Sequence, residues 1–140
     1  MRHRIKKIKF KSGRGANKMM TRKLIVNFIR QGKITTTLKR VKILKAQIEK
    51  LVEKMKVKNE ANKNKLLSVV GDERLIPKMF EDIGKPLKER VGGYVKIVRL
   101  GARQSDSAEV AMLEWAYPII TNKEIKGKKA KESQETQKKK

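Results

Sequence analysis

The spacing of apolar side chains along the middle of the chain is that of amphipathic helices. The clearest helix is predicted from about Leu38 to Val57, where apolar residues follow alternating steps of three and four. These apolar positions are Leu38, Val41, Leu44, Ile48, Leu51 and Met55. Thr36 or Thr37 is expected to cap the first turn. The opposite face carries Lys39, Lys42, Lys50 and Glu53. Such a face is usually only solvated, but the Lys39–Lys42 end could also face phosphate.

Three further helices are predicted from weaker patterns. One runs from Lys18 to Gln31, where apolar residues recur at four-residue steps and a glycine follows as a stop. A short helix ends at Gly71 and contains Leu66, Leu67, Val69 and Val70. Asp72 is placed to cap the next helix, whose apolar side consists of Leu75, Ile76, Met79, Phe80 and Ile83. Pro77 lacks a backbone donor, so this helix begins late or has a distorted first turn.

Runs of β-branched and aromatic residues predict three strands. The first is brief, from Ile34 to Thr36. The other two, Tyr94–Leu100 and Glu109–Tyr117, are expected to pair as an antiparallel hairpin across the polar loop Gly101–Ala108. Two adjacent glycines, Gly92-Gly93, come before the second strand, which usually marks a positive φ angle or a bulge.

The order of these elements predicts an α+β fold. Helices grouped ahead of a hairpin favour a two-layer domain, with about four helices packed on one face of a small sheet. This domain is expected to span residues 18–118. Residues 1–17 lack a sustained apolar period and are interrupted by Ser12, Gly13 and Gly15. They are expected to form an extended basic arm, which alone in water would be disordered. Residues 119–140 are expected to form a disordered, Lys-rich tail.

The chain is strongly basic, and the charge is concentrated at its ends. Lysine and arginine number 38 against 14 aspartate and glutamate residues, which gives a formal net charge of +24. Residues 1–23 hold ten basic residues and no acid, and residues 123–140 hold eight lysines and three glutamates. An excess of this size creates a positive field that attracts a polyanion. Nucleic acid is the usual partner, and an anionic membrane surface is the other candidate.

The residue types that catalysis requires are scarce. The chain has no cysteine, which excludes a disulfide framework and a thiolate zinc site. Its one histidine, His3, lies in the predicted arm, where a general base would not be held in place. The glycines form neither a dinucleotide-binding motif nor a P-loop. We therefore expect a protein that is not an enzyme and that uses no metal and no cofactor.

The aromatic residues favour one mode of nucleic-acid binding over another. Only Phe10 lies within the basic arm, and Phe28 and Phe80 occupy apolar helical positions where packing explains them. A basic arm attached to a small domain suits threading between RNA segments better than stacking on a single strand. A nucleoid-type DNA-binding protein remains an alternative, as does a membrane-surface protein. The first requires a groove-entering element or a dimer interface, and the second requires aromatic anchors in helix 18–31.

Several short blocks stand in the order found in a known family. They are Met1–Arg4, Ile34–Thr37 with Leu38–Val41, Lys78–Ile83, Arg90–Ile97, Gly101–Arg103 and Ala111–Glu114. Together they resemble the bacterial-type family of large-subunit ribosomal protein number seventeen, over roughly residues 1–116. The chain departs from the family pattern in a longer segment Ile5–Lys11 and in a tail after Tyr117. The loop Gln104–Ala108 also lacks the family's common Gly-Asp pair.

The resemblance carries specific expectations. It implies a small three-stranded mixed sheet, and binding to large-subunit ribosomal RNA near the exit side of the peptide tunnel, beside neighbouring large-subunit ribosomal proteins. It implies a bacterial cytoplasmic ribosome and leaves an organellar ribosome open. No homo-oligomer and no membrane partner are expected. It favours the Gly92-Gly93 junction as an RNA contact, with Arg90 and Arg103 as forked donors to phosphate. The residues expected to contact RNA are Arg2, His3, Arg4, Lys6, Lys7, Lys9, Lys11, Arg14, Lys18, Arg22, Lys39, Lys42, Arg90, Gly93, Tyr94 and Arg103.

Overall fold

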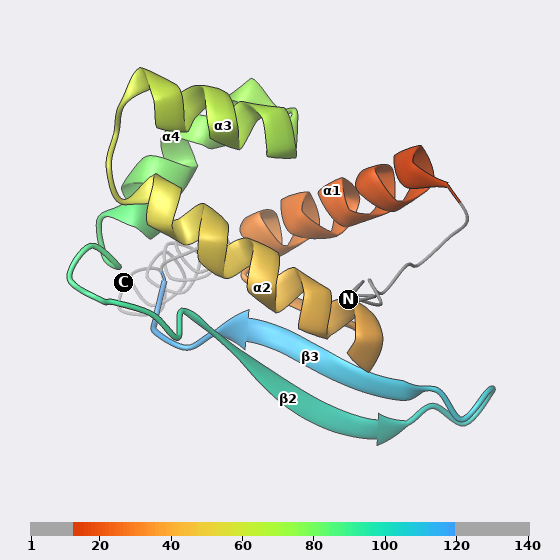
Figure 1. Cartoon of the computed structure of the whole chain (residues 1–140). Helices are drawn as coiled ribbons and strands as arrows, with labels where there is room; N and C mark the ends of the chain where they lie inside the picture. Colours follow the sequence, from red (N-terminus) through yellow and green to blue (C-terminus); the bar gives the residue numbers. More distant parts are fainter. Residues whose placement is uncertain (1–12, 120–140) are drawn as a thin grey trace, which may run out of the picture.

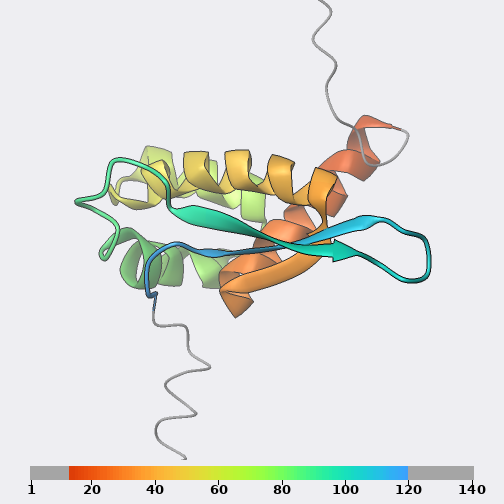
Figure 2. The same cartoon turned by 90° about the horizontal axis from the view of Figure 1, so that it is seen from below.

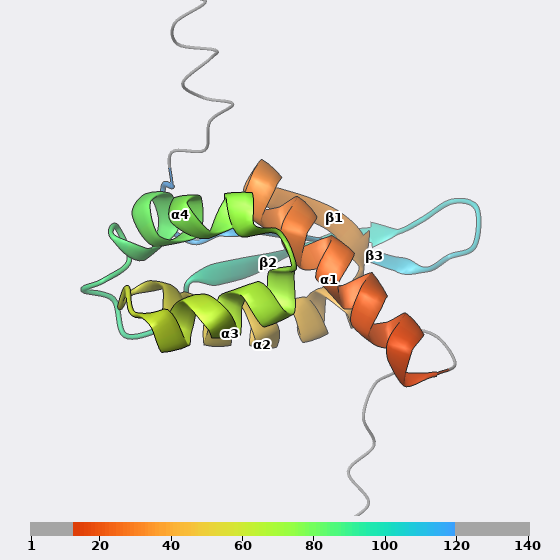
Figure 3. The ribbon, with the colours of Figure 1, turned by 90° about the horizontal axis from the view of Figure 1, so that it is seen from above.

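Helices cover one face of a three-stranded sheet in the computed structural model, which describes residues 13–119 (Figure 1). The elements in order are α1 (Arg14–Gln31), β1 (Lys33–Thr37), α2 (Leu38–Met55), α3 (Glu60–Val70), α4 (Ile76–Lys78), β2 (Val95–Ala102) and β3 (Glu109–Trp115). A 3₁₀ turn, η1 (Glu73–Leu75), precedes α4, and a π-helical segment, η2 (Met79–Gly84), follows it. The predicted α+β class is confirmed. Figure 3 shows α3 packed over α2 on the side away from the sheet.

The strand order in the sheet is β1-β3-β2, so the last strand of the sequence lies at the centre. β3 pairs antiparallel with both neighbours, which confirms the predicted hairpin. The mixed sheet implied by the family resemblance is therefore wrong. One face of β3 is buried under the helices, and its other face is seen from below in Figure 2. β2 extends through Gly101 and Ala102, which the sequence placed in the loop, because a bulge at this point lets pairing continue.

The apolar positions predicted for α2 form the centre of the core. All six are buried, together with Val52. Thr37 precedes this helix as its N-cap residue but makes no side-chain capping bond, so the predicted hydroxyl cap is wrong. Thr37 is also the last residue of β1, where it pairs with Val110, and the strand passes directly into the helix. The core includes residues of every layer, among them Phe28, Leu66, Met79 and Leu113.

α1 begins at Arg14, four residues before the predicted start at Lys18. Gly13, which was expected to interrupt the arm, instead stands at the N-cap with a φ of 90°. The predicted stop at Gly32 is confirmed, since this glycine is left-handed and its N–H donates to the Phe28 carbonyl at 2.8 Å. The Phe28 ring packs against Trp115 of β3 with centroids 4.6 Å apart, which ties α1 to the sheet.

The helix around Pro77 shows both of the predicted alternatives, since its first turn is the 3₁₀ turn η1, capped by Asp72, and α-helical geometry begins only with α4. α4 starts at Ile76, so Pro77 lies in the first turn, where a missing N–H leaves no helical bond unmade. The chain then widens into η2, which ends at the buried Gly84. A Cβ at Gly84 would overlap the carbonyl oxygen of Met55, the last residue of α2, and would lie 2.8 Å from its carbonyl carbon. Only glycine lets η2 and the end of α2 approach this closely.

Candidate nucleic-acid interface

A row of lysines follows the exposed face of α2. Lys39, Lys42 and Lys50 are all exposed and lie on the side of the helix opposite its buried residues. Among residues 13–119 none of the three has a carboxylate within ion-pair distance, whereas Lys45 faces Glu49 at 4.0 Å. With a rise of 1.5 Å per residue the row is roughly 16 Å long. We call these three residues the α2 lysine row. They offer positive charge that the described body does not neutralise.

Lys18 and Arg22, two of the three candidate residues on α1, differ in how accessible their side chains are. Lys18 is exposed. The Arg22 guanidinium donates to the carbonyls of Val69 and Ser68 at 3.0 and 2.9 Å, in the last turn of α3. These carbonyls lack helical partners, so Arg22 caps α3. Arg22, which was expected to bind phosphate, thus has a structural role in the body, where it joins α1 to α3.

Several candidates lie outside the described residues. These are Arg2, His3, Arg4, Lys6, Lys7, Lys9 and Lys11 of the predicted arm. Arg14 is the first residue of α1. The C-terminal tail lies outside the described part of the chain from residue 120 onward. The structure therefore bears only on the candidates that belong to the helices, strands and loops of the body.

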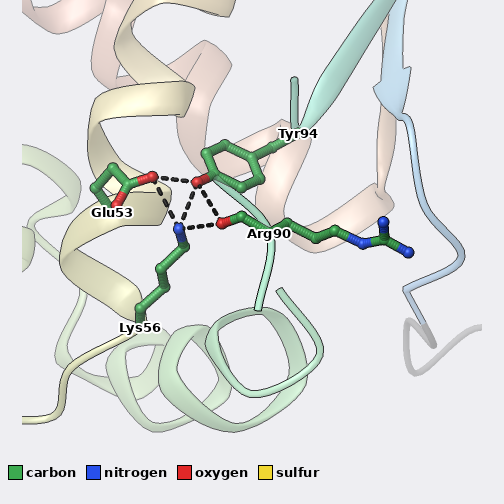
Figure 4. Close-up of polar contacts among 4 residues, drawn as sticks. All are labelled: Glu53, Lys56, Arg90 and Tyr94. Carbon is green, nitrogen blue, oxygen red and sulfur yellow. Dashed lines mark hydrogen bonds and ion pairs between the residues drawn. The ribbon is translucent and has the colours of Figure 1, made fainter. Parts of the chain in front are cut away.

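The glycine junction before β2 has the positive φ angle that the sequence predicts, and the tyrosine that follows it is buried. Gly93 has a φ of 66°, the positive angle expected for one of the two glycines. Tyr94, expected to contact RNA, is only 1% exposed, and its hydroxyl is engaged by Glu53 and Lys56 (Figure 4). The side chain points into the body, so it is not available at the surface for the expected RNA contact. Arg90 is exposed, and its guanidinium lies 4.7 Å from the centroid of the Tyr117 ring.

Lys56, Glu53 and Tyr94 form a hydrogen-bonded cluster, which we call the clasp. The Lys56 ammonium donates to Glu53 Oε1 at 2.9 Å, to Tyr94 Oη at 2.5 Å and to the Arg90 carbonyl at 2.5 Å (Figure 4). The Tyr94 hydroxyl donates to Glu53 Oε1. All three ammonium protons thus have acceptors. With its side chain only 11% exposed, Lys56 is withdrawn from any surface contact.

The electrostatics of the clasp keep its charges paired at neutral pH. The hydrogen bond from Tyr94, followed by that from Lys56, lowers the pKa of the Glu53 carboxyl. Burial raises the pKa of the Tyr94 hydroxyl, and the Glu53 carboxylate raises it further. Burial alone would lower the pKa of Lys56, but its hydrogen bonds to Tyr94 and Glu53 outweigh that effect and raise it. Glu53 is therefore ionised, Lys56 protonated and Tyr94 neutral.

The tip of the β2–β3 hairpin is closed by an ion pair. Arg103 donates through Nε and Nη2 to Asp106 at 2.9 and 2.5 Å. The same carboxylate accepts from the Ala108 amide at 3.2 Å, and Ser107 takes a positive φ of 52°. This arrangement makes the turn without the family's Gly-Asp pair. It also engages the Arg103 guanidinium, so a phosphate would have to compete with Asp106 for this expected donor.

The hairpin tip should respond to acid at an unusually low pH. The Arg103 hydrogen bond, followed by that of the Ala108 amide, lowers the pKa of Asp106 to about 2 from 3.8. Because the folded pKa is depressed, the support from this carboxylate is present above pH 3.8 and is lost as pH falls through about 2. We expect the Asp106 side-chain carbonyl resonance in NMR to titrate near pH 2, together with the Ser107 and Ala108 amides. A midpoint near 3.8 would show that the pair does not form in solution.

The roles of Glu53, Lys56 and Val91 in the structure have little sequence signal. Glu53 and Lys56 are three residues apart on a helix, which signals at most a surface ion pair. Val91, between Arg90 and the two glycines, was not singled out, yet it is 96% exposed. An exposed valine has no sequence signature of its own, because its neighbours in space decide its burial.

The charged and metal-ligating side chains of the described body show what kinds of site it can form. Within residues 13–119 there is no group of three histidine, cysteine, aspartate or glutamate residues that could hold a metal ion, and no charged side chain is buried. None of the described helices combines the length and apolarity that a membrane crossing requires. A small basic α+β body with a row of exposed lysines that have no carboxylate partner among residues 13–119 is typical of the class of nucleic-acid-binding proteins.

Comparison with known proteins identifies the family within that class. The family model described as Ribosomal protein L17 matches residues 20–116. The large ribosomal subunit protein bL17 of Halothermothrix orenii is 35% identical over 97 residues, or 69% of this chain and 85% of the relative. That of Rickettsia bellii is 36% identical over 88% of this chain and 87% of its own length. That of Borrelia turicatae is 32% identical over 76% and 86%. The chain belongs to the ribosomal protein L17 family, which confirms the resemblance.

Membership of the ribosomal protein L17 family establishes the general function of the chain. The chain is a structural constituent of the large ribosomal subunit and not an enzyme. It is associated there with ribosomal RNA and with other ribosomal proteins.

Proposed function

We propose that the chain binds large-subunit ribosomal RNA through the α2 lysine row, with Lys18 and the basic segment before α1 adding phosphate contacts. The observation that carries this proposal is the row itself: Lys39, Lys42 and Lys50 are exposed, aligned and without carboxylate partners in the described body. Lysines in such a row neutralise phosphates and release condensed counterions. The sheet and the core hold α2 rigid, so the row is presented in a fixed geometry.

The protein acts in this proposal as a clamp between RNA segments. α2 contributes a straight basic face roughly 16 Å long, and the six basic residues that precede α1 in the sequence enter between neighbouring RNA helices. Phosphate contacts position a protein on RNA without reading its sequence. Recognition then depends on the shape of the assembled RNA site.

We also propose that the chain binds near the exit side of the peptide tunnel, a location that rests on the family resemblance. Because the chain has no cysteine, a single Lys42→Cys variant can carry a tethered hydroxyl-radical source. In reconstituted large subunits, cleavage is expected in RNA around the tunnel exit. Cleavage confined to another region would contradict this placement and leave the RNA contact itself standing.

RNA affinity should fall steeply with salt. Each neutralised phosphate contributes roughly 0.9 to the slope of log affinity against log salt, so the lysine row with Lys18 alone predicts a slope of about −4. We expect filter-binding or fluorescence titrations between about 50 and 200 mM salt to show at least this slope, with little discrimination between unrelated RNAs. A nearly flat dependence would contradict a phosphate-dominated mode.

Sedimentation of cell lysate on a sucrose gradient tests the function in the cell. The protein is expected to migrate with large ribosomal subunits at low salt. Recovery only with DNA or with membranes would contradict the proposal and favour one of the alternative partners.

A further inference from the structure

The loop between η2 and β2 presents an apolar side chain to solvent on a fixed backbone. Val91 is 96% exposed, the highest value among the exposed large apolar residues of the described chain. Gly92 and Gly93 follow it, and apart from the adjacent residues of the chain no heavy atom lies within 4 Å of a Cβ position at either glycine. The loop lies at the end of the molecule opposite the hairpin tip (Figure 2). A partner could therefore approach both the valine and the bare glycine backbone closely.

The clasp holds the residue immediately before this valine. The Arg90 carbonyl accepts from the Lys56 ammonium at 2.5 Å, and the Tyr94 hydroxyl lies 3.1 Å from the same oxygen. These contacts join the loop to the end of α2 across 34 residues of sequence (Figure 4). The other side of the loop is fixed by Tyr94 itself, whose ring is buried and whose carbonyl accepts from the Ala116 amide at 2.9 Å. The four residues 90–93 are thus tied at both ends.

The side chain of Arg90 is also held. Its guanidinium lies over the Tyr117 ring, 4.7 Å from the centroid. In Figure 4 this side chain extends away from the clasp, so Arg90 offers its carbonyl to the body and its charge to the surface. Lys85 and Lys88, both exposed, add positive charge just before the loop, against one exposed glutamate, Glu89. The loop is therefore apolar at its apex and basic at its base.

We propose that the clasp is a positioning device that presents Val91 and the glycine backbone, preformed, to ribosomal RNA. This inference rests on the proposed function and names a second contact of the same protein. RNA fits the loop because its base is cationic, because bare backbone N–H groups can reach phosphate, and because an aliphatic apex can contact a ribose or an exposed base. A loop that is ordered before binding loses less conformational entropy on binding than a mobile one.

Removing the clasp without disturbing the core tests the device. Tyr94→Phe keeps the buried ring and removes the hydroxyl. Lys56→Met removes the ammonium group that donates to Glu53, Tyr94 and the Arg90 carbonyl. In full-length protein that remains folded, both variants are expected to speed hydrogen exchange at the Gly92 and Gly93 amides. Affinity for RNA extracted from large subunits should fall about tenfold. Lys54→Met is the matched control, since it removes one exposed charge of the same helix and leaves the clasp intact. Loss equal to that of the control would overturn the proposal.

A double-mutant cycle separates positioning from a general effect on stability. Val91→Ser should also lower RNA affinity, and combining it with Lys56→Met should add less than the sum of the two losses, because both act through one contact. Full additivity, or an unchanged affinity for Val91→Ser, would overturn the inference. In either case an unaltered salt slope would leave the α2 lysine row, and with it the proposed function, standing.

A photo-reactive residue at position 91 identifies the partner. In assembled large subunits, a benzophenone side chain in place of Val91 is expected to cross-link to ribosomal RNA. Cross-linking only to a neighbouring protein, or no cross-link at all, would overturn the assignment of RNA as the partner.

Discussion

Gly84→Ala is expected to destabilise the fold by about 3 kcal/mol, which lowers the melting temperature by roughly 12–24 °C. The added methyl group would overlap the Met55 carbonyl oxygen. This oxygen belongs to the backbone at the end of α2, so it cannot turn aside as a flexible side chain could. Relief requires η2 to move away from α2, and the contacts of Phe80 and Ile83 with the core would loosen with it.

Thermal and urea denaturation followed by circular dichroism measure this effect. Gly92→Ala is the matched control, because a Cβ there has no atom within 4 Å and the φ angle of this residue is not positive. Its stability should stay within about 0.5 kcal/mol of the parent chain. If Gly84→Ala melts like the control, the close approach of η2 and α2 does not exist in solution.

Replacing the α2 lysine row by glutamine is expected to weaken RNA binding by about two orders of magnitude near 0.1 M salt. The triple variant Lys39→Gln, Lys42→Gln, Lys50→Gln removes three phosphate contacts, so the slope of log affinity against log salt should become shallower by nearly three. These side chains are exposed and make no ion pair in the described body, so the melting temperature should change little.

A control with the same loss of charge shows whether position matters. Lys58, Lys65 and Lys78 are exposed and lie outside α2, around α3 and α4. Changing these three to glutamine should alter the salt slope much less. Equal effects of the two triple variants would mean that net charge alone governs binding, and that α2 is not a defined contact surface.

The helical core could be predicted from the sequence because its pattern is local. The apolar positions of α2 recur with the helical period, and all of them are buried. Glycine stops are equally local, and Gly32 and Gly71 both end helices in the left-handed conformation that permits them. The start of α1 was misplaced because Gly13 and Gly15 suggested an interrupted arm, whereas Gly13 only marks the first turn.

The roles of Tyr94 and Arg22 could not be predicted, because their partners are distant in sequence. Tyr94 meets Lys56 across 38 residues, and Arg22 meets Val69 across 47. An aromatic residue beside two glycines, or an arginine in a basic stretch, has the same local pattern whether it binds RNA or its own chain. The lysine row was foreseen because amphipathicity assigns Lys39 and Lys42 to the exposed face.

The central position of β3 has a consequence for how the protein folds during its own synthesis. Within the described residues β1 pairs only with β3, which is made much later, since Ile34 pairs with Leu113, 79 residues on, and Thr37 with Val110, 73 residues on. While β3 is still inside the translating ribosome, neither β1 nor β2 has a strand to pair with in this sheet. The emerging chain therefore exposes two unpaired strands and the apolar face of α2, a state open to aggregation and to chaperones. The body can close only when its last strand has left the tunnel, so its folding is completed late in translation.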